Sequence, residues 1–177
     1  MADQSDERRL AQWRIGLVAA GASCAALAGT FLWKPAPVLL WNASPSSPVG
    51  LYWVRHSRDP GIGDMAIAWP PPPARRLAAR RHYLPAGVPL VKNVAAVAGS
   101  RVCAKGPAVS VNGRPAAVRR SRDRAGRRLP WWSGCRTLGK GELFLLAARV
   151  PEAFDGRYFG ITRASEVIGE GRLLWPR

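Results

Sequence analysis

The sequence predicts a mainly β domain that follows one apolar helix at the N-terminus. Within the 177 residues, short apolar segments alternate with turn residues at the spacing expected of an all-β domain. Only residues 73–83 have a helical pattern outside the N-terminal region. The predicted strands are residues 50–55, 64–69, 89–97, 101–104, 108–112, 142–149 and 165–174.

Two turn signals lie between the predicted strands. Asn112-Gly113 in the segment VNGRP predicts a two-residue hairpin, because a type I′ turn needs a positive φ at both central positions. The segment WPPPPARR at residues 69–76 predicts a polyproline II connector.

Residues 15–33 carry no charge and are flanked by Trp13-Arg14 and Trp33-Lys34. About 20 apolar residues span a bilayer as a helix, and tryptophan favours the membrane interface. We therefore expect a transmembrane helix over residues 15–34. A cleaved signal peptide and a lipoprotein signal ending at Cys24 are the alternatives.

The charges around this helix predict its orientation. Arg8, Arg9 and Arg14 precede it, which favours a short cytoplasmic segment at residues 1–14. Residues 35–177 would then form a periplasmic domain of a single-pass protein of the inner (cytoplasmic) membrane.

An oxidising periplasm favours paired cysteines. Cys24 lies in the predicted span, so Cys103 and Cys135 remain as partners for one disulfide. Two unpaired buried thiols are the alternative.

The formal net charge of +16 comes almost entirely from arginine, since the chain has only four lysines. Arginines gather at residues 113–140, within a predicted hairpin extension over residues 104–140 that also holds Trp131 and Trp132. Such a surface could bind phosphates and bases, or anionic lipid headgroups. For an exported domain we favour the lipids of the inner membrane over nucleic acid.

The common catalytic and metal-binding patterns do not occur in this sequence. The chain has two histidines, His56 and His82, which are too few for a metal site without free cysteines. It has no G-x-S-x-G motif and no phosphate-binding glycine loop. We therefore predict no metal and no cofactor.

Lys92 is the unusual residue of the predicted strand 89–97. Strand alternation places it on the same face as Leu90, Val94 and Ala96. Burial disfavours the ammonium form, so a buried lysine can serve as a general base that activates a hydroxyl. Alternatively, Lys92 reaches the surface or pairs with a carboxylate.

Three motifs in this order resemble the signal peptidase I superfamily of serine-lysine peptidases. They are NASPSSPVGLY at residues 42–52, PLVKNVAAVAG at 89–99 and FDGRYFG at 154–160. The first motif and the segment LPWWSGCRTLGKGELFLL are more similar to the conjugative-transfer (TraF-type) branch that processes pilins. The resemblance implies a signal-peptidase-like β-sheet catalytic domain.

The resemblance also implies a role for individual residues. Ser46 matches the nucleophile and Lys92 the general base, while the Ser44 hydroxyl and the Ser46 N–H match the oxyanion donors. Asp155 and Arg157 match a supporting ion pair beside the lysine. Ser47 stands where the family commonly has methionine, so residue type leaves Ser46 and Ser47 both open as nucleophile.

The implied function is a membrane-anchored serine endopeptidase that cleaves exported precursors, such as conjugative pilins, at small residues. Hydrolysis and cyclisation are both open. The predicted strands 50–55 and 64–69 are expected to bind the substrate by β-addition, with Ala66 and Ala68 either leaving room for small side chains or lying in the core. The alternatives are a non-catalytic membrane-anchored β-domain of a conjugation or secretion complex, and a basic nucleic-acid-binding module.

Overall fold

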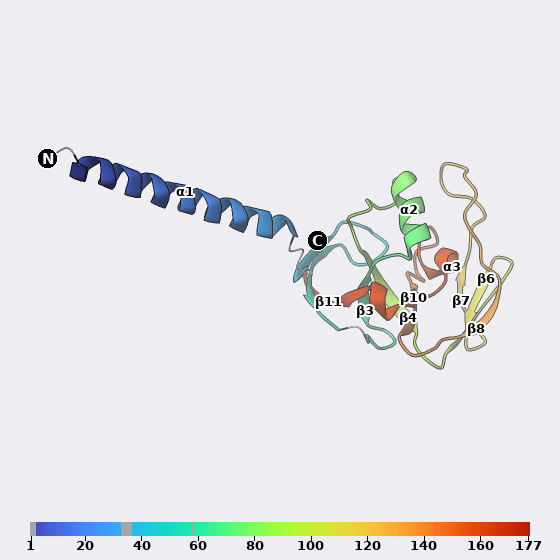
Figure 1. Ribbon diagram of the computed structural model, residues 1–177. Coiled ribbons are helices and arrows are strands. Elements are labelled where there is room, and N and C mark those ends of the chain that lie inside the picture. The colour runs from blue at the N-terminus through green and yellow to red at the C-terminus, as the bar shows by residue number, and fades with distance from the viewer. Residues whose placement is uncertain (1–2, 33–36, 58) are drawn as a thin grey trace. The chain divides into compact units, whose positions relative to one another are not determined.

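The computed structural model describes residues 3–32, 37–57 and 59–177, which divide into two compact units, Met1–Ala36 and Pro37–Arg177. The first unit contains one helix, α1, at Asp3–Leu32 (Figure 1). Among the described residues, no helix has both the length and the apolar character needed to cross a membrane. Residues 33 and 34 of the predicted span lie outside the described residues.

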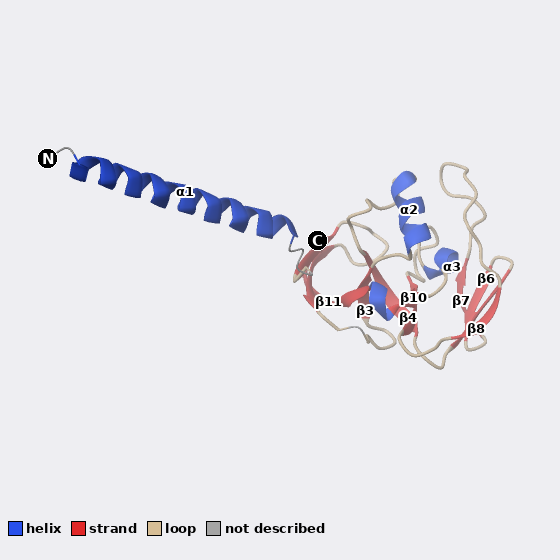
Figure 2. Cartoon of the chain, in the orientation of Figure 1, coloured by secondary structure: helices blue, strands red, loops and turns tan. Residues whose placement is uncertain are grey.

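The second unit is mainly β, as predicted, and contains two antiparallel sheets (Figure 2). The larger sheet has seven strands in the order β1-β2-β11-β3-β4-β9-β10. Their bounds are β1 Leu39–Asn42, β2 Gly50–Arg55, β3 Met65–Ala68, β4 Leu90–Ala96, β9 Glu142–Leu146, β10 Thr162–Arg163 and β11 Val167–Pro176.

The smaller sheet has the strand order β7-β6-β5-β8, and three short helices complete the unit. The strands are β5 Arg101–Lys105, β6 Ala108–Val111, β7 Arg114–Val118 and β8 Gly134–Thr137. The helices are α2 Pro72–Arg80, α3 Gly156–Phe159 and the 3-10 helix Ala164–Glu166.

The C-terminal strand β11 lies between β2 and β3 and pairs with both. Each of these strands is therefore paired along both edges, β2 with β1 and β3 with β4. The prediction that residues 50–55 and 64–69 bind substrate by β-addition is wrong for this reason. Ala66 and Ala68 are fully buried in the core with Val94 and Leu145.

The structure confirms the hairpin turn predicted from the sequence, but not the polyproline II connector. Asn112 and Gly113 have φ values of 50° and 78°, which confirms the type I′ prediction. The polyproline II prediction for residues 69–76 is wrong beyond its first residues, because α2 already begins at Pro72. Proline is compatible with the first turn of a helix, where its missing N–H has no helical acceptor.

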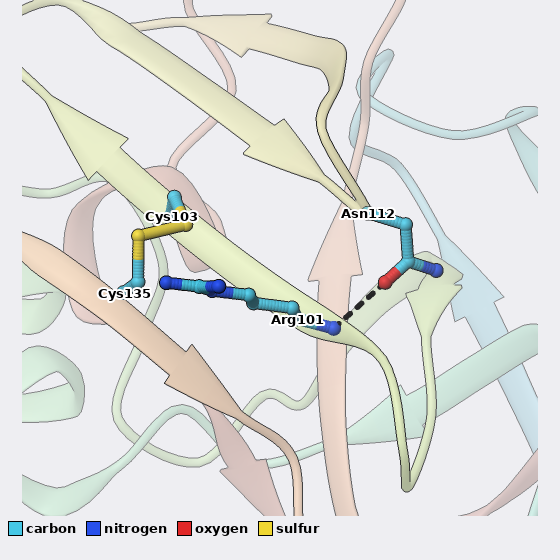
Figure 3. The surroundings of a disulfide bond; sticks show 4 residues. All are labelled: Arg101, Cys103, Asn112 and Cys135. Carbon is cyan, nitrogen blue, oxygen red and sulfur yellow. Dashed lines mark hydrogen bonds between the residues drawn. A yellow bond between two sulfur atoms is a disulfide. The ribbon is translucent and has the colours of Figure 1, made fainter.

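A disulfide joins β5 to β8, which lies near the end of the arginine-rich residues 113–140 (Figure 3). Cys103 of β5 and Cys135 of β8 are directly opposite each other in the ladder, with Cα atoms 4.0 Å apart. This confirms the predicted pairing. At the start of β5, the backbone N–H of Arg101 donates to Oδ1 of Asn112 at 2.7 Å, which ties the hairpin turn to the same strand.

Gly50 begins β2 in a position where a side chain has no room. A Cβ atom there would lie 2.1 Å from the carbonyl oxygen of Trp175. We expect Gly50→Ala to lower the free energy of unfolding by more than about 2 kcal/mol, because the backbone of β11 would have to shift. Thermal unfolding in detergent measures the effect.

The matched control is Gly87→Ala, since a Cβ at Gly87 would meet no atom within 4 Å. It should change the free energy of unfolding by less than about 1 kcal/mol. Equal melting temperatures for the two variants would contradict the close packing of β2 on β11.

Candidate active site

The loop between β1 and β2 is organised by the buried side chain of Asn42. The Nδ2 group of Asn42 donates to the carbonyl oxygens of Ser44 at 3.0 Å, Pro48 at 2.9 Å and Ser47 at 3.3 Å. Its Oδ1 accepts from the Ser44 N–H at 3.1 Å. Asn42 also pairs with Gly50 across the base of the loop, so one side chain fixes the backbone that carries all three serines.

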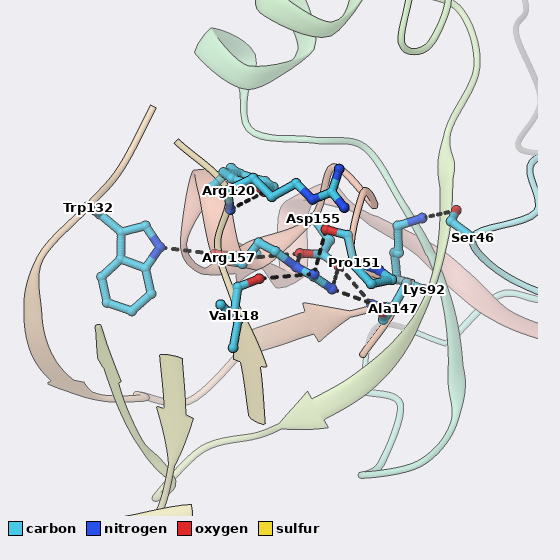
Figure 4. Close-up of polar contacts among 11 residues, drawn as sticks. Ser46, Lys92, Val118, Arg120, Trp132, Ala147, Pro151, Asp155 and Arg157 are labelled. Atoms are coloured by element: carbon cyan, nitrogen blue, oxygen red, sulfur yellow. Dashed lines mark hydrogen bonds and ion pairs between the residues drawn. The ribbon is translucent and has the colours of Figure 1, made fainter. Parts of the chain in front are cut away.

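The three serines of this loop have different surroundings. The Oγ of Ser46 accepts a hydrogen bond from Nζ of Lys92 at 2.5 Å (Figure 4). The Ser47 hydroxyl is buried and donates to the carbonyl oxygen of Val91 at 2.6 Å. The structure thus brings Ser46 to the lysine and uses Ser47 to attach the loop to β4, a distinction that residue type leaves open.

Ser44 lies directly beside Ser46. The two Oγ atoms are 2.8 Å apart, and the Ser46 N–H donates to the Ser44 Oγ at 3.4 Å. The two groups predicted as oxyanion donors, the Ser44 hydroxyl and the Ser46 N–H, therefore lie side by side next to the Ser46 hydroxyl, where they contact each other.

Lys92 is only 3% exposed although its side chain can carry a charge. Burial lowers the pKa of Lys92 from 10.5 to about 8; the charge of Asp155 acts in the opposite direction, and the charge of Arg157 lowers the pKa further. The structure contradicts the alternative in which this lysine reaches the surface. A lysine with this pKa is neutral in a much larger fraction of molecules near neutral pH than an exposed lysine.

Asp155 and Arg157 form a buried ion pair behind the lysine (Figure 4). Nε and Nη2 of Arg157 donate to the two carboxylate oxygens at 2.8 and 3.0 Å. The carboxylate also accepts from the backbone N–H of Ala147 at 2.8 Å and caps the N-terminus of α3. A buried charge needs both a partner and hydrogen bonds, and this pair has them: it connects Ala147, which follows β9, with the start of α3.

A pocket of about 810 Å³ adjoins Ser46 and Lys92. Part of the lining comes from the serine loop and the beginning of β4, and Ala153 also lines the pocket. Further walls come from the segment after α2 and from the loop between β7 and β8. The larger apolar and aromatic side chains of the lining are those of Leu40, Trp41, Tyr83, Leu84, Val88, Leu90, Val91, Leu129, Val150, Phe154 and Tyr158.

These groups together have the chemistry of a nucleophile and a base. A neutral lysine can accept the proton of the hydroxyl that it contacts, and the hydroxyl oxygen then attacks an electrophile held in the pocket. Within the part of the chain that the structure describes, no group of three or more His, Cys, Asp or Glu side chains is placed to hold a metal ion.

Asn42 is the residue of this site that the sequence interpretation missed. The sequence predicts no role for this residue, although asparagine commonly bonds to backbone groups two residues further on. We expect Asn42→Ala to speed amide hydrogen exchange in the loop by about ten-fold or more, because several carbonyl groups lose their donor.

Asn93→Ala is the matched control, because Asn93 is exposed and makes one long bond, to the carbonyl of Gly63 at 3.5 Å. Exchange in the serine loop should not change in this variant. Equal exchange rates in the Asn42→Ala and Asn93→Ala proteins would show that Asn42 does not hold the loop.

Comparison with known proteins places this chain among peptidases. The family described as "Signal peptidase, peptidase S26" matches residues 10–175. A signal peptidase I of known structure from Enterococcus faecalis aligns with 66% of this chain and 97% of its own, at 19% identity and a TM-score of 0.36.

Three relatives have names that refer to conjugal or plasmid transfer. A probable conjugal transfer protein TraF of Sinorhizobium fredii is 36% identical over 72% of each chain. A plasmid transfer protein TraF of Escherichia coli is 34% identical over 71% of this chain and 76% of its own. A conjugal transfer protein TraF of Agrobacterium fabrum is 32% identical over 90% of each chain. The family match across nearly the whole sequence, with these relatives, shows that the chain belongs to the signal peptidase family, peptidase S26.

Proposed function

We propose that this protein is a membrane-anchored serine endopeptidase in which Ser46 is the nucleophile and Lys92 the general base. The observation that carries the proposal is the 2.5 Å hydrogen bond between a buried lysine and the Ser46 hydroxyl. Membership of the signal peptidase family supports the same class of reaction.

The reaction begins when neutral Lys92 accepts the proton of the Ser46 hydroxyl and the oxygen attacks a peptide carbonyl. The Ser44 hydroxyl rotates away from Ser46 Oγ toward the carbonyl oxygen of the substrate. Together with the Ser46 N–H, it stabilises the negative charge that develops on that oxygen. Protonated Lys92 then gives its proton to the leaving amine, and an acyl-enzyme ester on Ser46 remains. Water releases a free carboxylate from this ester, whereas a second amine forms a new peptide bond.

The proposed substrate is an exported precursor protein, with a conjugative pilin as the first candidate. Conjugal or plasmid transfer appears in the names of the relatives, and a pocket of about 810 Å³ is large enough for several residues of an extended chain. We further propose that the precursor is cleaved at small residues. The acyl-enzyme then reacts with water, which gives hydrolysis, or with an amine of the same chain, which gives a cyclic product.

We also propose that the protein is held in the inner membrane by residues 15–34, with its peptidase domain in the periplasm. The uncharged segment and the arginines that precede it support this topology. The disulfide is in keeping with an oxidising compartment.

An exposed tryptophan face on the larger sheet further supports contact with lipid. Trp41 of β1 and Trp175 of β11 are both paired with Leu51 of β2, and Trp53 lies two residues further along β2. Paired residues and residues two apart share a face of a sheet. The three tryptophans are 40–70% exposed, and tryptophan prefers the membrane interface.

The test is cleavage of a co-encoded pilin-like precursor by membranes that contain the full-length protein. Ser46→Ala and Lys92→Met should each lower the rate by about 100-fold or more, because each removes one half of the proton transfer. Ser47→Ala should still cleave at a reduced rate, since it loses only an anchor to Val91.

Thermal unfolding of each variant in detergent shows whether the folded domain is present. A folded Ser46→Ala or Lys92→Met protein that cleaves the precursor at the wild-type rate would refute the proposed dyad. The chain would then be better described as a non-catalytic domain of a transfer complex.

A further inference from the structure

The pocket that adjoins Ser46 and Lys92 has a strongly basic lining. Five arginines line the pocket, namely Arg81, Arg120, Arg122, Arg124 and Arg127. Only two carboxylates line it, those of Asp123 and Glu152, so the walls carry an excess of three positive charges without Lys92. The arginines other than Arg81 belong to the residue 120–129 loop, between β7 and β8.

Both carboxylates of the pocket are already engaged. Asp123 accepts from the hydroxyl of Tyr83, from Nε of Arg127 at 2.7 Å and from two backbone N–H groups. Desolvation raises the pKa of Asp123, but the hydrogen bonds from Tyr83 and Arg127 outweigh it and hold the pKa well below its ordinary value. Glu152 pairs with Arg120 at 2.8 Å.

Two arginines of the loop have no carboxylate partner among the described residues. Arg122 donates through Nη1 to the carbonyl of Gly126 at 2.6 Å and forms no ion pair there. Arg124 is exposed and makes no hydrogen bond or ion pair within the described part of the chain. Their charges are therefore available to a ligand.

The loop that carries these arginines is held in place rather than extended into solvent. Asp123 connects it to Tyr83 after α2, and Arg81 donates through Nη1 to the backbone carbonyl of Arg128 at 2.9 Å. Within the loop, Leu129 N–H donates to the Ser121 carbonyl at 2.9 Å. In Figure 1 the loop accordingly rises on the same side of the domain as α2. A fixed loop loses little conformational entropy when its side chains bind a ligand.

We infer that Arg122 and Arg124 form a subsite for acidic side chains of the peptide that occupies the pocket. The inference rests on the proposed peptidase function, because it assigns the occupant of the pocket as a peptide. Arginine binds carboxylates through two parallel, charge-assisted hydrogen bonds, and Arg122 and Arg124 line the pocket with this donor group.

A peptide explains this placement better than a lipid headgroup does. The two unpaired arginines line the same pocket as Ser46 and Lys92. An acidic residue close to the scissile bond can therefore contact them while the carbonyl group lies at Ser46.

Equilibrium binding to the full-length Ser46→Ala protein tests the inference. The protein is placed in phosphatidylcholine nanodiscs and titrated with two labelled short peptides. One peptide has two aspartates, and the other has asparagines at the same two positions. We expect the aspartate peptide to bind about ten-fold or more tightly, because a charged acceptor roughly doubles the strength of such hydrogen bonds. Adding Arg122→Gln and Arg124→Gln should reduce this preference to about two-fold or less.

The matched control is Arg128→Gln, which removes the same charge from an exposed arginine of the same loop that does not line the pocket. It should leave the preference for the aspartate peptide unchanged. A preference that falls equally in this control would show a general charge effect and overturn the inference. The inference is also overturned if the Ser46→Ala protein with all its loop arginines shows no preference for the aspartate peptide, or binds neither peptide.

A second arm compares vesicles of phosphatidylglycerol and phosphatidylcholine. If the double variant loses binding to the anionic vesicles but keeps its preference for the aspartate peptide, the arginines bind lipid and the inference is wrong. Because binding is measured on a protein without the proposed nucleophile, the result does not depend on catalysis. Failure of the precursor cleavage test would count against the peptidase proposal alone.

Discussion

The burial of Lys92 against the hydroxyl of Ser46 is the constraint on which the rest of this site depends. Lys92 is carried by β4, which is paired on both sides within the seven-stranded sheet. The Ser47 hydroxyl bonds to the carbonyl of Val91, the residue before the lysine, and so aligns the serine loop with β4. The Asp155–Arg157 pair fixes the neighbouring segment. Each contact restrains one side of the lysine–serine hydrogen bond.

The buried lysine also costs stability. Because its pKa is about 8 in the folded protein and near 10.5 when exposed, the folded state binds fewer protons than the unfolded state between these pH values. Stability therefore rises as the pH rises from 8 to 10.5, and below pH 8 the full cost of about 3 kcal/mol is present. The surrounding core must offset this cost. Such a cost is in keeping with a group retained for its reactivity rather than for stability.

Local patterns in the sequence were enough to predict much of this fold and part of the site. Asn112-Gly113 is sufficient to predict its turn, and the position of Lys92 in an otherwise apolar strand indicates a buried lysine. The strand β8, Gly134–Thr137, was missed because its residues are exposed and its pairing is set by β5. The bonds of Asn42 and the association of the arginine loop with the pocket depend on tertiary contacts that no local pattern contains.

A direct titration of Lys92 tests the central claim most directly. With only four lysines in the chain, nuclear magnetic resonance of selectively labelled lysine side chains can follow each one, and Lys92→Met assigns the signal. The account predicts that Lys92 titrates with a pKa of about 8, so that the active neutral form, and with it the cleavage rate, increases as the pH rises through this value. A Lys92 signal that titrates near 10.5, like that of an exposed lysine, would contradict the account.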